Sequence, residues 1–446
     1  MPDLTLQRCA SCGAELPERD ARTSCPACGG LLALEHAPPA ERGAALRDRF
    51  DARLRDAAAG HVADAAGAAR ASGVWRFREL IMPGATDADI VSQPEGNTPL
   101  FHRPSVAAWA GVDGLLLKHD GFNPTGSFKD RGMTVALTQA RRAGARAVAC
   151  ASTGNTSAAL AAYAALAGVP GLVLVPAPKG GAQQVALGKL AQTLAYGART
   201  LLVRGDFDDC LRLVREGAER LGVYLVNSIN PYRIEGQKSV ALEILQQLAW
   251  NAPDWIVLPA GNLGNTSAVG AALRDAVRLG LIDRAPRIAS IQAAGANPFA
   301  SGYRENFATQ HRVKAETVAT AIKIGDPASW DRAAAVIREF DGVVTDVSDA
   351  EILEAKAAID AAGIGCEPAS AASVAGVRRL AREGVIRAGD RVAAILTGHV
   401  LKDPGVLLDY HRADHDAPLV NAPVEVDATL DALARVVDAT AAAAGR

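Results

Sequence analysis

Short apolar runs alternate with longer segments of helical periodicity along most of the chain. These runs occupy residues 147–151, 171–175, 200–203, 224–226, 255–258, 288–292 and 392–396. Apolar runs of this length, separated by helix-length segments, are typical of buried parallel strands. The pattern therefore predicts an α/β fold with doubly wound parallel sheets. In such folds ligands bind at the loops that follow the carboxyl ends of the strands.

The segment before this alternation has a different pattern. Residues 40–72 are rich in alanine and charged residues, and Leu46, Phe50 and Leu54 recur at helical spacing. This spacing predicts one or two helices, which Gly73 ends.

The stretch from Asn123 to Gly132 combines a turn-forming loop with a helix start. Ser127 and Asp130 have the spacing of a capping box, which predicts that the helix begins at or near Ser127. Lys129 would then lie in the first turn, where the positive end of the helix dipole favours the neutral amine that attacks carbonyl groups. We interpret Lys129 as a candidate Schiff-base lysine; the alternative is an ordinary surface lysine on an amphipathic helix.

Two loops that follow predicted strands, 152–158 and 261–268, both contain Gly-Asn-Thr-Ser-Ala. Each would present backbone N–H groups and hydroxyls at a helix N-terminus, which favours an anion. Neither loop has the spacing of a dinucleotide fingerprint, so a single phosphate fits better. The alternative is ordinary loop and cap chemistry.

Polar residues also follow two other predicted strands. In the polar segment that starts at Asn227, Ser228, Arg233 and Lys238 form a candidate third anion site. Lys323 lies in a similar polar turn, although single exposed basic residues are more often solvated. At the end of the last predicted strand, Thr397 offers a hydroxyl where a carboxylate could have stood.

Two cysteine pairs lie close to the N-terminus. Cys9 and Cys12 form one pair, Cys25 and Cys28 the other, and a glycine follows each pair. This spacing resembles the two knuckles of a zinc ribbon, in which four thiolates close a structural tetrahedral site. The alternatives are a reducible thiol pair or a ribbon without metal.

Composition narrows the classes of partner. The 446 residues carry a net charge of −2, which gives no reason to expect nucleic acid or an acidic membrane as a partner, so a small molecule is favoured. The first residues lack the apolar core of a signal peptide, and no apolar run is long enough to span a membrane, so we expect a cytoplasmic protein.

Taken together, the motifs resemble those of the threonine synthase family, pyridoxal-phosphate enzymes of fold type II, the tryptophan-synthase-β-like fold. The segments that carry the resemblance are 73–77, 95–100, 123–132, 152–158, 227–238, 261–265 and 397–403. The resemblance implies two α/β domains with the cofactor, pyridoxal 5'-phosphate, in the cleft between them. The expected division is 1–36 (zinc-ribbon-like), 37–92 (helical connector), 93–121 with 233–425 (large domain), 122–232 (small domain) and 426–446 (C-terminal helix or tail).

The resemblance also implies a role for each candidate residue. Lys129 would hold the cofactor as a Schiff base, Asn155 would contact its ring hydroxyl, and Thr397 would contact its ring nitrogen. The implied cofactor-phosphate loop is Gly261, Asn262, Leu263, Gly264 and Asn265. The residues implied for the substrate carboxylate are Ser152, Thr153, Thr156 and Ser157, and those for the substrate phosphate are Asn227, Ser228, Arg233 and Lys323, with Thr156 as a further candidate.

The implied reaction converts O-phosphohomoserine and water into threonine and phosphate, in a homodimer. The alternatives within the fold are a serine or threonine dehydratase and a cysteate synthase that uses phosphoserine. An alternative from another class is a non-catalytic binding protein whose ribbon contacts nucleic acid or another protein. The scarcity of basic residues in the first 36 positions disfavours a reader of nucleic acid.

Overall fold

The computed structural model describes residues 4–58, 64–177, 187–412 and 419–444. The chain forms two compact units, Met1–Asp403 and Pro404–Arg446. The second unit contains α15 (Pro404–Tyr410) and α16 (Leu430–Ala444). Parts of the predicted segments lie outside the described residues: 1–3 of the ribbon, 59–63 of the helical connector, 178–186 of the small domain, 413–418 of the large domain and 445–446 of the tail.

The larger sheet of the first unit has six strands in the order β12-β11-β10-β13-β5-β4. Its pairs are parallel except for the antiparallel edge strand β4. The strands are β4 (Leu100–His102), β5 (Gly114–His119), β10 (Trp255–Pro259), β11 (Arg287–Ala293), β12 (Val343–Val347) and β13 (Arg391–Leu396).

Alternate residues of this sheet face two separate cores. Ile256 and Leu258 contribute to a core with α9 (Pro231–Gln247), α10 (Gly264–Arg278) and α12 (Trp330–Glu339). Trp255 and Val257 contribute to a core with α4 (Pro104–Ala110), α13 (Asp349–Ala361) and α14 (Pro368–Arg382). Helices therefore cover both faces, as the doubly wound prediction requires.

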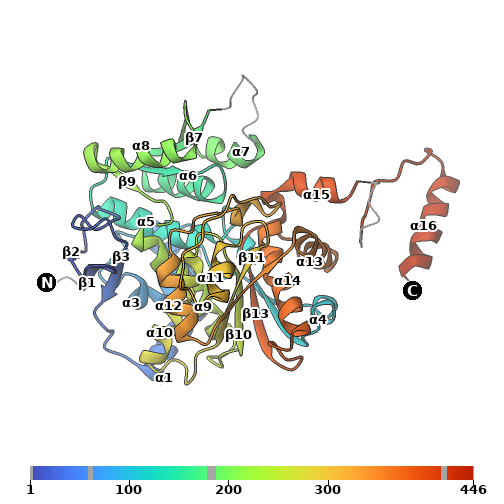
Figure 1. Cartoon of the computed structure of the whole chain (residues 1–446), viewed down its shortest axis with the longest axis horizontal. Coiled ribbons are helices and arrows are strands. Elements are labelled where there is room, and N and C mark those ends of the chain that lie inside the picture. The colour runs from blue at the N-terminus through green and yellow to red at the C-terminus, as the bar shows by residue number, and fades with distance from the viewer. Residues whose placement is uncertain (1–3, 59–63, 178–186, 413–418, 445–446) are drawn as a thin grey trace. The chain divides into compact units, whose positions relative to one another are not determined.

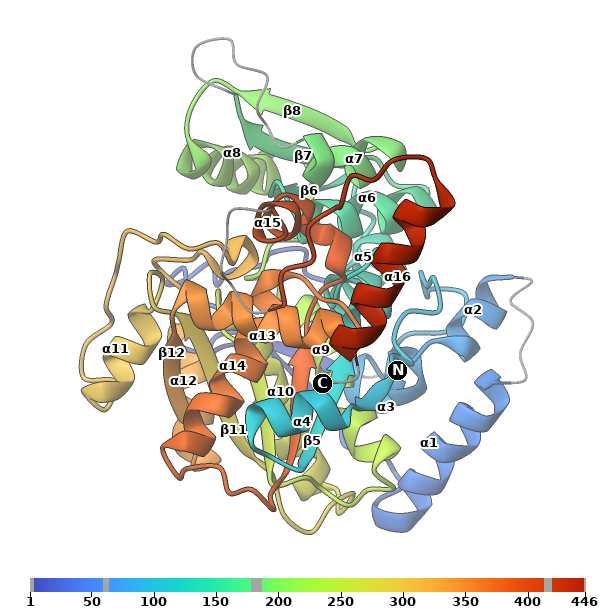
Figure 2. The same cartoon turned by 90° about the vertical axis from the view of Figure 1, so that its right-hand side faces the viewer.

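The smaller sheet is entirely parallel, in the order β8-β7-β6-β9. Its strands, drawn in the upper part of Figures 1 and 2, are β6 (Ala147–Ala151), β7 (Gly171–Pro176), β8 (Arg199–Val203) and β9 (Val223–Leu225). Helices α5 (Lys129–Arg142), α6 (Asn155–Ala167) and α7 (Leu187–Ala195) share one core with the sheet, and α8 (Phe207–Arg220) packs on a second core.

All seven predicted strands are present, each with ends within one residue of the prediction. The prediction missed β4, β5 and β12. Thr345 and Asp346 interrupt the apolar pattern of β12, and β5 ends in Lys118 and His119. Lys118 is fully buried and donates to the Glu243 carboxylate at 2.7 Å, so a polar residue occupies a position that a strand pattern expects to be apolar.

The N-terminal segment forms a small antiparallel sheet, β2-β1-β3, from β1 (Thr5–Cys9), β2 (Glu15–Pro17) and β3 (Leu32–His36). It is attached to the body through Glu18, whose backbone carbonyl accepts from Gln139 of α5 and from the Tyr232 hydroxyl of α9. The predicted helical stretch follows as α1 (Gly43–Ala58) and α2 (Ala65–Ala71).

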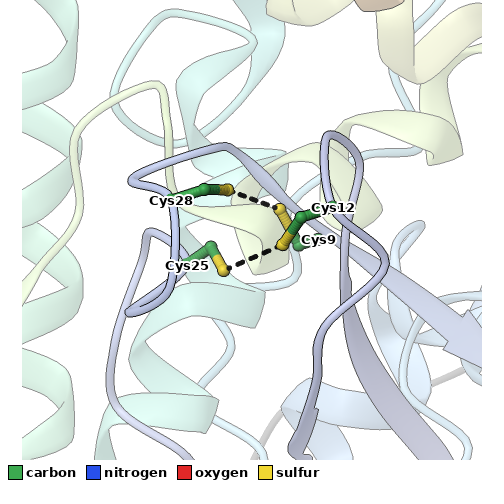
Figure 3. A group of neighbouring side chains, drawn as sticks. All are labelled: Cys9, Cys12, Cys25 and Cys28. Carbon is green, nitrogen blue, oxygen red and sulfur yellow. Dashed lines mark hydrogen bonds between the residues drawn. The ribbon is translucent and has the colours of Figure 1, made fainter.

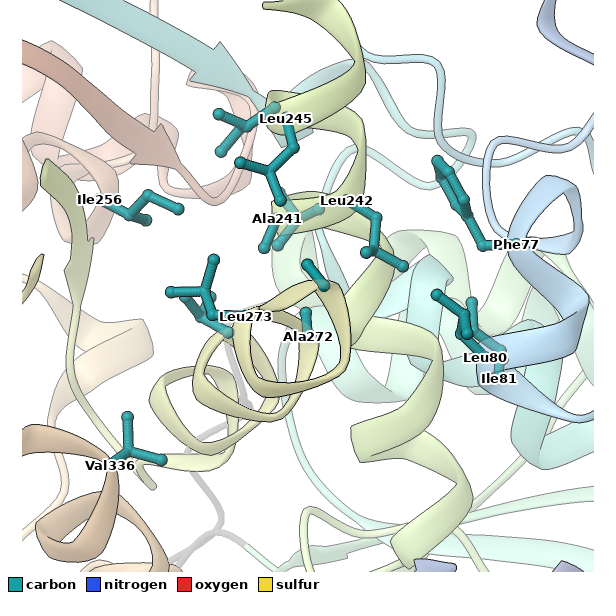
Figure 4. Close-up of a cluster of buried hydrophobic side chains, with 14 of the residues drawn as sticks. Phe77, Leu80, Ile81, Ala241, Leu242, Leu245, Ile256, Ala272, Leu273 and Val336 are labelled. Atoms are coloured by element: carbon teal, nitrogen blue, oxygen red, sulfur yellow. The ribbon is translucent and has the colours of Figure 1, made fainter. Parts of the chain in front are cut away.

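Helix α9 crosses α5 at very short range, and two glycines permit the crossing. A Cβ atom at Gly236 would lie 1.9 Å from the Arg131 carbonyl oxygen, and one at Gly132 would lie 2.7 Å from that of Arg233. Beyond the crossing, apolar side chains of α9 pack against α10, β10 and the segment around Phe77 (Figure 4). This crossing fixes the start of α5, and hence Lys129, relative to Arg233.

In the described part of the chain, none of the helices combines the length and the apolar composition needed to cross a bilayer.

Candidate active site

A cleft of about 1440 Å³ collects the loops that follow β6, β9, β10 and β13. Most predicted cofactor and substrate residues line it. These are Lys129, Ser152, Thr153, Asn155, Thr156, Asn227, Ser228, Arg233, Gly261, Asn262, Leu263, Gly264, Asn265, Lys323 and Thr397. Ser157 does not belong to the lining: it is buried in the first turn of α6, and its hydroxyl donates to the Gly154 carbonyl at 2.8 Å.

Lys129 is the first residue of α5, but the predicted capping box is wrong. The backbone of Ser127 forms a bridge to Gly398, and the Phe128 N–H donates to the Thr397 carbonyl at 2.9 Å, so these residues belong to a strand-like contact before the helix. The Asp130 carboxylate accepts from the backbone N–H of Thr125 at 2.7 Å and not from Ser127. Asp130 therefore closes the loop before the helix, which still aims Lys129 into the cleft.

The surroundings of Lys129 favour the neutral form of its amine. Burial and the positive charge of Arg233 lower its pKa from 10.5 to about 7, although Glu367 acts in the opposite direction. The prediction attributed this preference to the helix dipole, whereas the structure provides burial and a neighbouring guanidinium. A neutral amine near pH 7 is the form that adds to an aldehyde.

The loop before α10 has the features of a phosphate cradle. Leu263, the residue directly before the helix, has a left-handed backbone conformation (φ 64°). Residues other than glycine rarely adopt this conformation. Both polar atoms of the buried Asn265 amide lack a hydrogen-bond partner among the described residues. A Cβ at Gly261 would approach Ile322 to 3.2 Å, so the loop lies tightly against the next segment. An anionic group here would satisfy the orphaned donors, so the loop fits the cofactor phosphate.

Asn155 and Thr397 approach each other through a third residue, Glu367, which also lines the cleft. The Asn155 amide donates to one Glu367 oxygen at 2.9 Å, and the Thr397 hydroxyl donates to the other at 3.2 Å. Glu367 is 3% exposed, and burial raises the pKa of its carboxyl group. Sequence reasoning missed it; the available signal was a carboxylate directly before Pro368 at a helix start.

Arg233 is the strongest candidate for an anion on a substrate. The side chain is 1% exposed, its Nη1 donates to the Val226 carbonyl at 3.1 Å, and its Nε has no partner among the described residues. Burial lowers its pKa to about 10, and none of the carboxylates in the described part of the chain forms an ion pair with its guanidinium. Lys323, in contrast, pairs with Glu316 at 2.5 Å. The prediction that Lys238 belongs to this anion site is wrong, because Lys238 lies outside the cleft lining and pairs with Glu235 and Asp275, each at 2.7 Å. Both amide atoms of Asn227 are bonded to the Ala151 backbone.

A further buried cation of the cleft lining was not predicted. Arg332, in the first turn of α12, has a buried Nη2 without a partner among the described residues. Its isolated position in the sequence gave no signal that it would reach the site.

The four cysteines converge on one point (Figure 3), with all Sγ atoms within 4.8 Å of one another. The Sγ atoms of Cys9 and Cys28 are 3.5 Å apart, and those of Cys12 and Cys25 are 3.6 Å apart. A tetrahedron with Zn–S bonds of about 2.3 Å places its sulfur atoms about 3.8 Å apart, so the set fits a closed structural zinc site. Gly13 and Gly29 adopt positive φ angles of 75° and 72° and allow the two knuckle turns.

The family model for pyridoxal-phosphate-dependent enzymes matches residues 91–398. The fold, and a cleft centred on a lysine with a lowered pKa, define an enzyme of this class. A threonine synthase of Methanosarcina acetivorans is 42% identical over 96% of this chain and 98% of its own length. A threonine synthase of Synechocystis is 49% identical over 75% of this chain and 85% of its own length. The chain belongs to the threonine synthase family.

Solved structures show the same architecture at lower identity. Threonine synthase from Escherichia coli aligns with a TM-score of 0.66 at 18% identity, covering 98% of this chain and 100% of that one. Maize serine racemase aligns with a TM-score of 0.60 at 22% identity, covering 76% and 95%.

Proposed function

We propose that this enzyme converts O-phosphohomoserine and water into threonine and phosphate. The resemblance of its motifs implies this substrate, and the name of its relatives, threonine synthase, agrees with the product. The observation that carries the proposal is Arg233, a buried guanidinium that lines the same cleft as Lys129 and forms no ion pair with any carboxylate among the described residues. A buried cation of this kind is stable only when an anion pairs with it, and the substrate phosphate is such an anion.

Lys129 performs the proton transfers in this proposal. Its amine, with a pKa near 7, removes the proton from Cα of the substrate and then one from Cβ. The bound pyridoxal phosphate supplies the electron sink that makes these protons acidic. Phosphate leaves from Cγ with the electrons of its C–O bond, and Cγ gains a proton. A water oxygen then joins Cβ, and a proton returns to Cα to give threonine.

Arg233 orients the reacting end of the substrate. Its Nε has no partner among the described residues, and Ser228 and Thr156, from the loops after β9 and β6, line the same cleft with their hydroxyl groups. We assign the substrate phosphate to Arg233 ahead of Lys323, because Glu316 already compensates the Lys323 charge. The backbone of 152–156, at the start of α6, then remains for the substrate carboxylate, and the cradle before α10 for the cofactor phosphate.

A substrate panel tests this function. O-Phosphohomoserine, O-phosphoserine and threonine are supplied separately to the holoenzyme, and phosphate, 2-oxo acid and threonine are measured. We expect threonine and phosphate in equal amounts from O-phosphohomoserine alone. Phosphate release from O-phosphoserine in the presence of sulfite would instead favour a cysteate synthase, and 2-oxobutyrate from threonine would favour a dehydratase. The Arg233→Gln variant should raise KM for the phosphorylated substrate, with Arg274→Gln on the exposed face of α10 as a control.

We also propose that the first unit divides as predicted, because all strands of the six-stranded sheet lie within 93–121 and 233–425 and those of the four-stranded sheet within 122–232.

We propose a homodimer in the cytoplasm that uses neither nucleic acid nor a membrane, on the basis of the resemblance and of the small net charge. Light scattering of the purified holoenzyme at several concentrations tests the dimer.

A further inference from the structure

Glu367 has no role in the residue assignments above, yet it occupies the centre of the cofactor end of the cleft. Its position is fixed from both sides. The Glu367 backbone N–H donates to the Gly398 carbonyl at 3.0 Å, and a Cβ at Gly398 would lie only 2.4 Å from the Glu367 carboxyl carbon. The carboxyl group therefore packs directly on the backbone that follows β13, at the start of α14.

The two partners of Glu367 are the two side chains assigned to the cofactor ring. Asn155 reaches it from the start of α6, and Thr397 reaches it from the end of β13. These residues are far apart in sequence and follow strands of different sheets, so the carboxyl group links the two sides of the cleft and helps to set their relative orientation. Ser370, one turn into α14, holds the other side of the Thr397 hydroxyl at 3.1 Å.

The hydroxyl of Thr397 has a single proton, which limits what it can do. If Glu367 is ionised, Thr397 donates this proton to the carboxylate and can only accept from the cofactor ring. If Glu367 is neutral, the acid donates to Thr397, and Thr397 is free to donate to an unprotonated ring nitrogen. The state of Glu367 thus determines the direction of the hydrogen bond at the ring.

We propose that Glu367 is a positioning residue that acts in its neutral form, holding Asn155 against the ring hydroxyl and directing the Thr397 hydroxyl toward an unprotonated ring nitrogen. The proposal rests on the assignment of Asn155 and Thr397 to the cofactor. Burial favours the neutral acid, whereas Lys402, Asn155, Thr397 and Lys129 favour the ionised form. The thiol of Cys366, the residue before Glu367 in the chain, also interacts electrostatically with this carboxyl group.

The test compares Glu367→Gln, Glu367→Ala and the unchanged holoenzyme, each reconstituted with cofactor labelled with ¹⁵N at the ring nitrogen. Glutamine has the shape of the neutral acid, can accept from Asn155 and can donate to Thr397. We expect Glu367→Gln to keep the cofactor dissociation constant within about threefold and to keep the ¹⁵N chemical shift of an unprotonated ring nitrogen. Glu367→Ala should weaken cofactor binding by roughly tenfold or more, because two hydrogen-bonding groups lose their common partner.

Two results would overturn the proposal. The first is a Glu367→Gln enzyme that loses the cofactor or gains a protonated ring nitrogen, since the negative charge would then be the essential property. The second is a Glu367→Ala enzyme with unchanged affinity and chemical shift. Glu383→Ala at the exposed far end of α14 is the control. If Glu367→Ala does not fold, the glutamine variant alone decides. These measurements need no substrate, so their failure leaves the proposed reaction untouched.

Discussion

The reactivity of Lys129 gives a prediction that can be worked out from the structure. Its pKa of about 7, set by burial and by Arg233, replaces an ordinary value of 10.5. At pH 7 about half of the Lys129 amine is neutral, compared with about one part in three thousand for an ordinary lysine, so the neutral form is enriched more than a thousandfold. The apoenzyme should therefore bind pyridoxal phosphate at a rate that rises between pH 6 and 8 and levels off above.

Stopped-flow absorbance of the apoenzyme mixed with cofactor measures this rate. Nα-Acetyl-lysine serves as the reference. Its rate, divided by its own fraction of neutral amine at each pH, reports the titration of the cofactor alone and is used to correct the enzyme rate. The direction in which each variant moves the Lys129 pKa follows from the charge that the variant removes near the amine. Arg233→Gln removes a charge that lowers the Lys129 pKa, so the midpoint should move to higher pH. Arg274→Gln, in an exposed ion pair with Glu339, should leave the midpoint unchanged.

The reasoning is refuted if the corrected rate rises with a midpoint above pH 9, as for a solvated lysine. It is also refuted if Arg233→Gln moves the midpoint to lower pH, since a guanidinium near the amine cannot favour its charged form.

Three further predictions concern the scaffold. Gly236→Ala should lower the free energy of unfolding in urea by about 1–3 kcal/mol or more, because its Cβ would lie 1.9 Å from a backbone oxygen of α5. Gly217→Ala on α8 is the control: a Cβ there meets nothing within 4 Å, so this variant should not be destabilised. Glu243→Gln should lower the free energy of unfolding by about 3–5 kcal/mol, because Lys118 and Arg131 each lie within 2.8 Å of its carboxylate inside the core. The control Glu339→Gln, in an exposed ion pair, should lower it by less than about 1 kcal/mol. Purified protein should contain one zinc per chain by metal analysis, and Cys28→Ser should lower that content and the melting temperature of the ribbon; full zinc occupancy in this variant would contradict a four-thiolate site.

The sequence predicted the parts of the fold that rest on continuous apolar runs. All seven predicted strands formed, because strands buried on both faces, such as β10, must be apolar at every position. Strands with polar residues escaped the prediction because their polar groups are compensated by distant partners. Lys118 in β5 is acceptable in the core only because Glu243 of α9 reaches it, and no local pattern reveals that contact.

The same distinction holds for the candidate site. Glycine-rich loops after strands are local signals, so the cleft lining was largely predicted, including Lys129 and the loop before α10. The cap at Ser127 was mispredicted because contacts with Thr397 and Gly398, far along the chain, hold Ser127 and Phe128 in a strand-like segment, so that Phe128 and not Ser127 directly precedes the helix. Glu367 and Arg332 were missed for the same reason: tertiary contacts, and not spacing, bring them to the cleft.

The central claim is that phosphate leaves by cleavage of its bond to carbon while water adds at the neighbouring carbon. The most direct test is the reaction of O-phosphohomoserine in H₂¹⁸O, followed by mass spectrometry of both products. The account predicts threonine with one ¹⁸O in its hydroxyl group and phosphate without label. Labelled phosphate together with homoserine would indicate simple ester hydrolysis and would contradict the account.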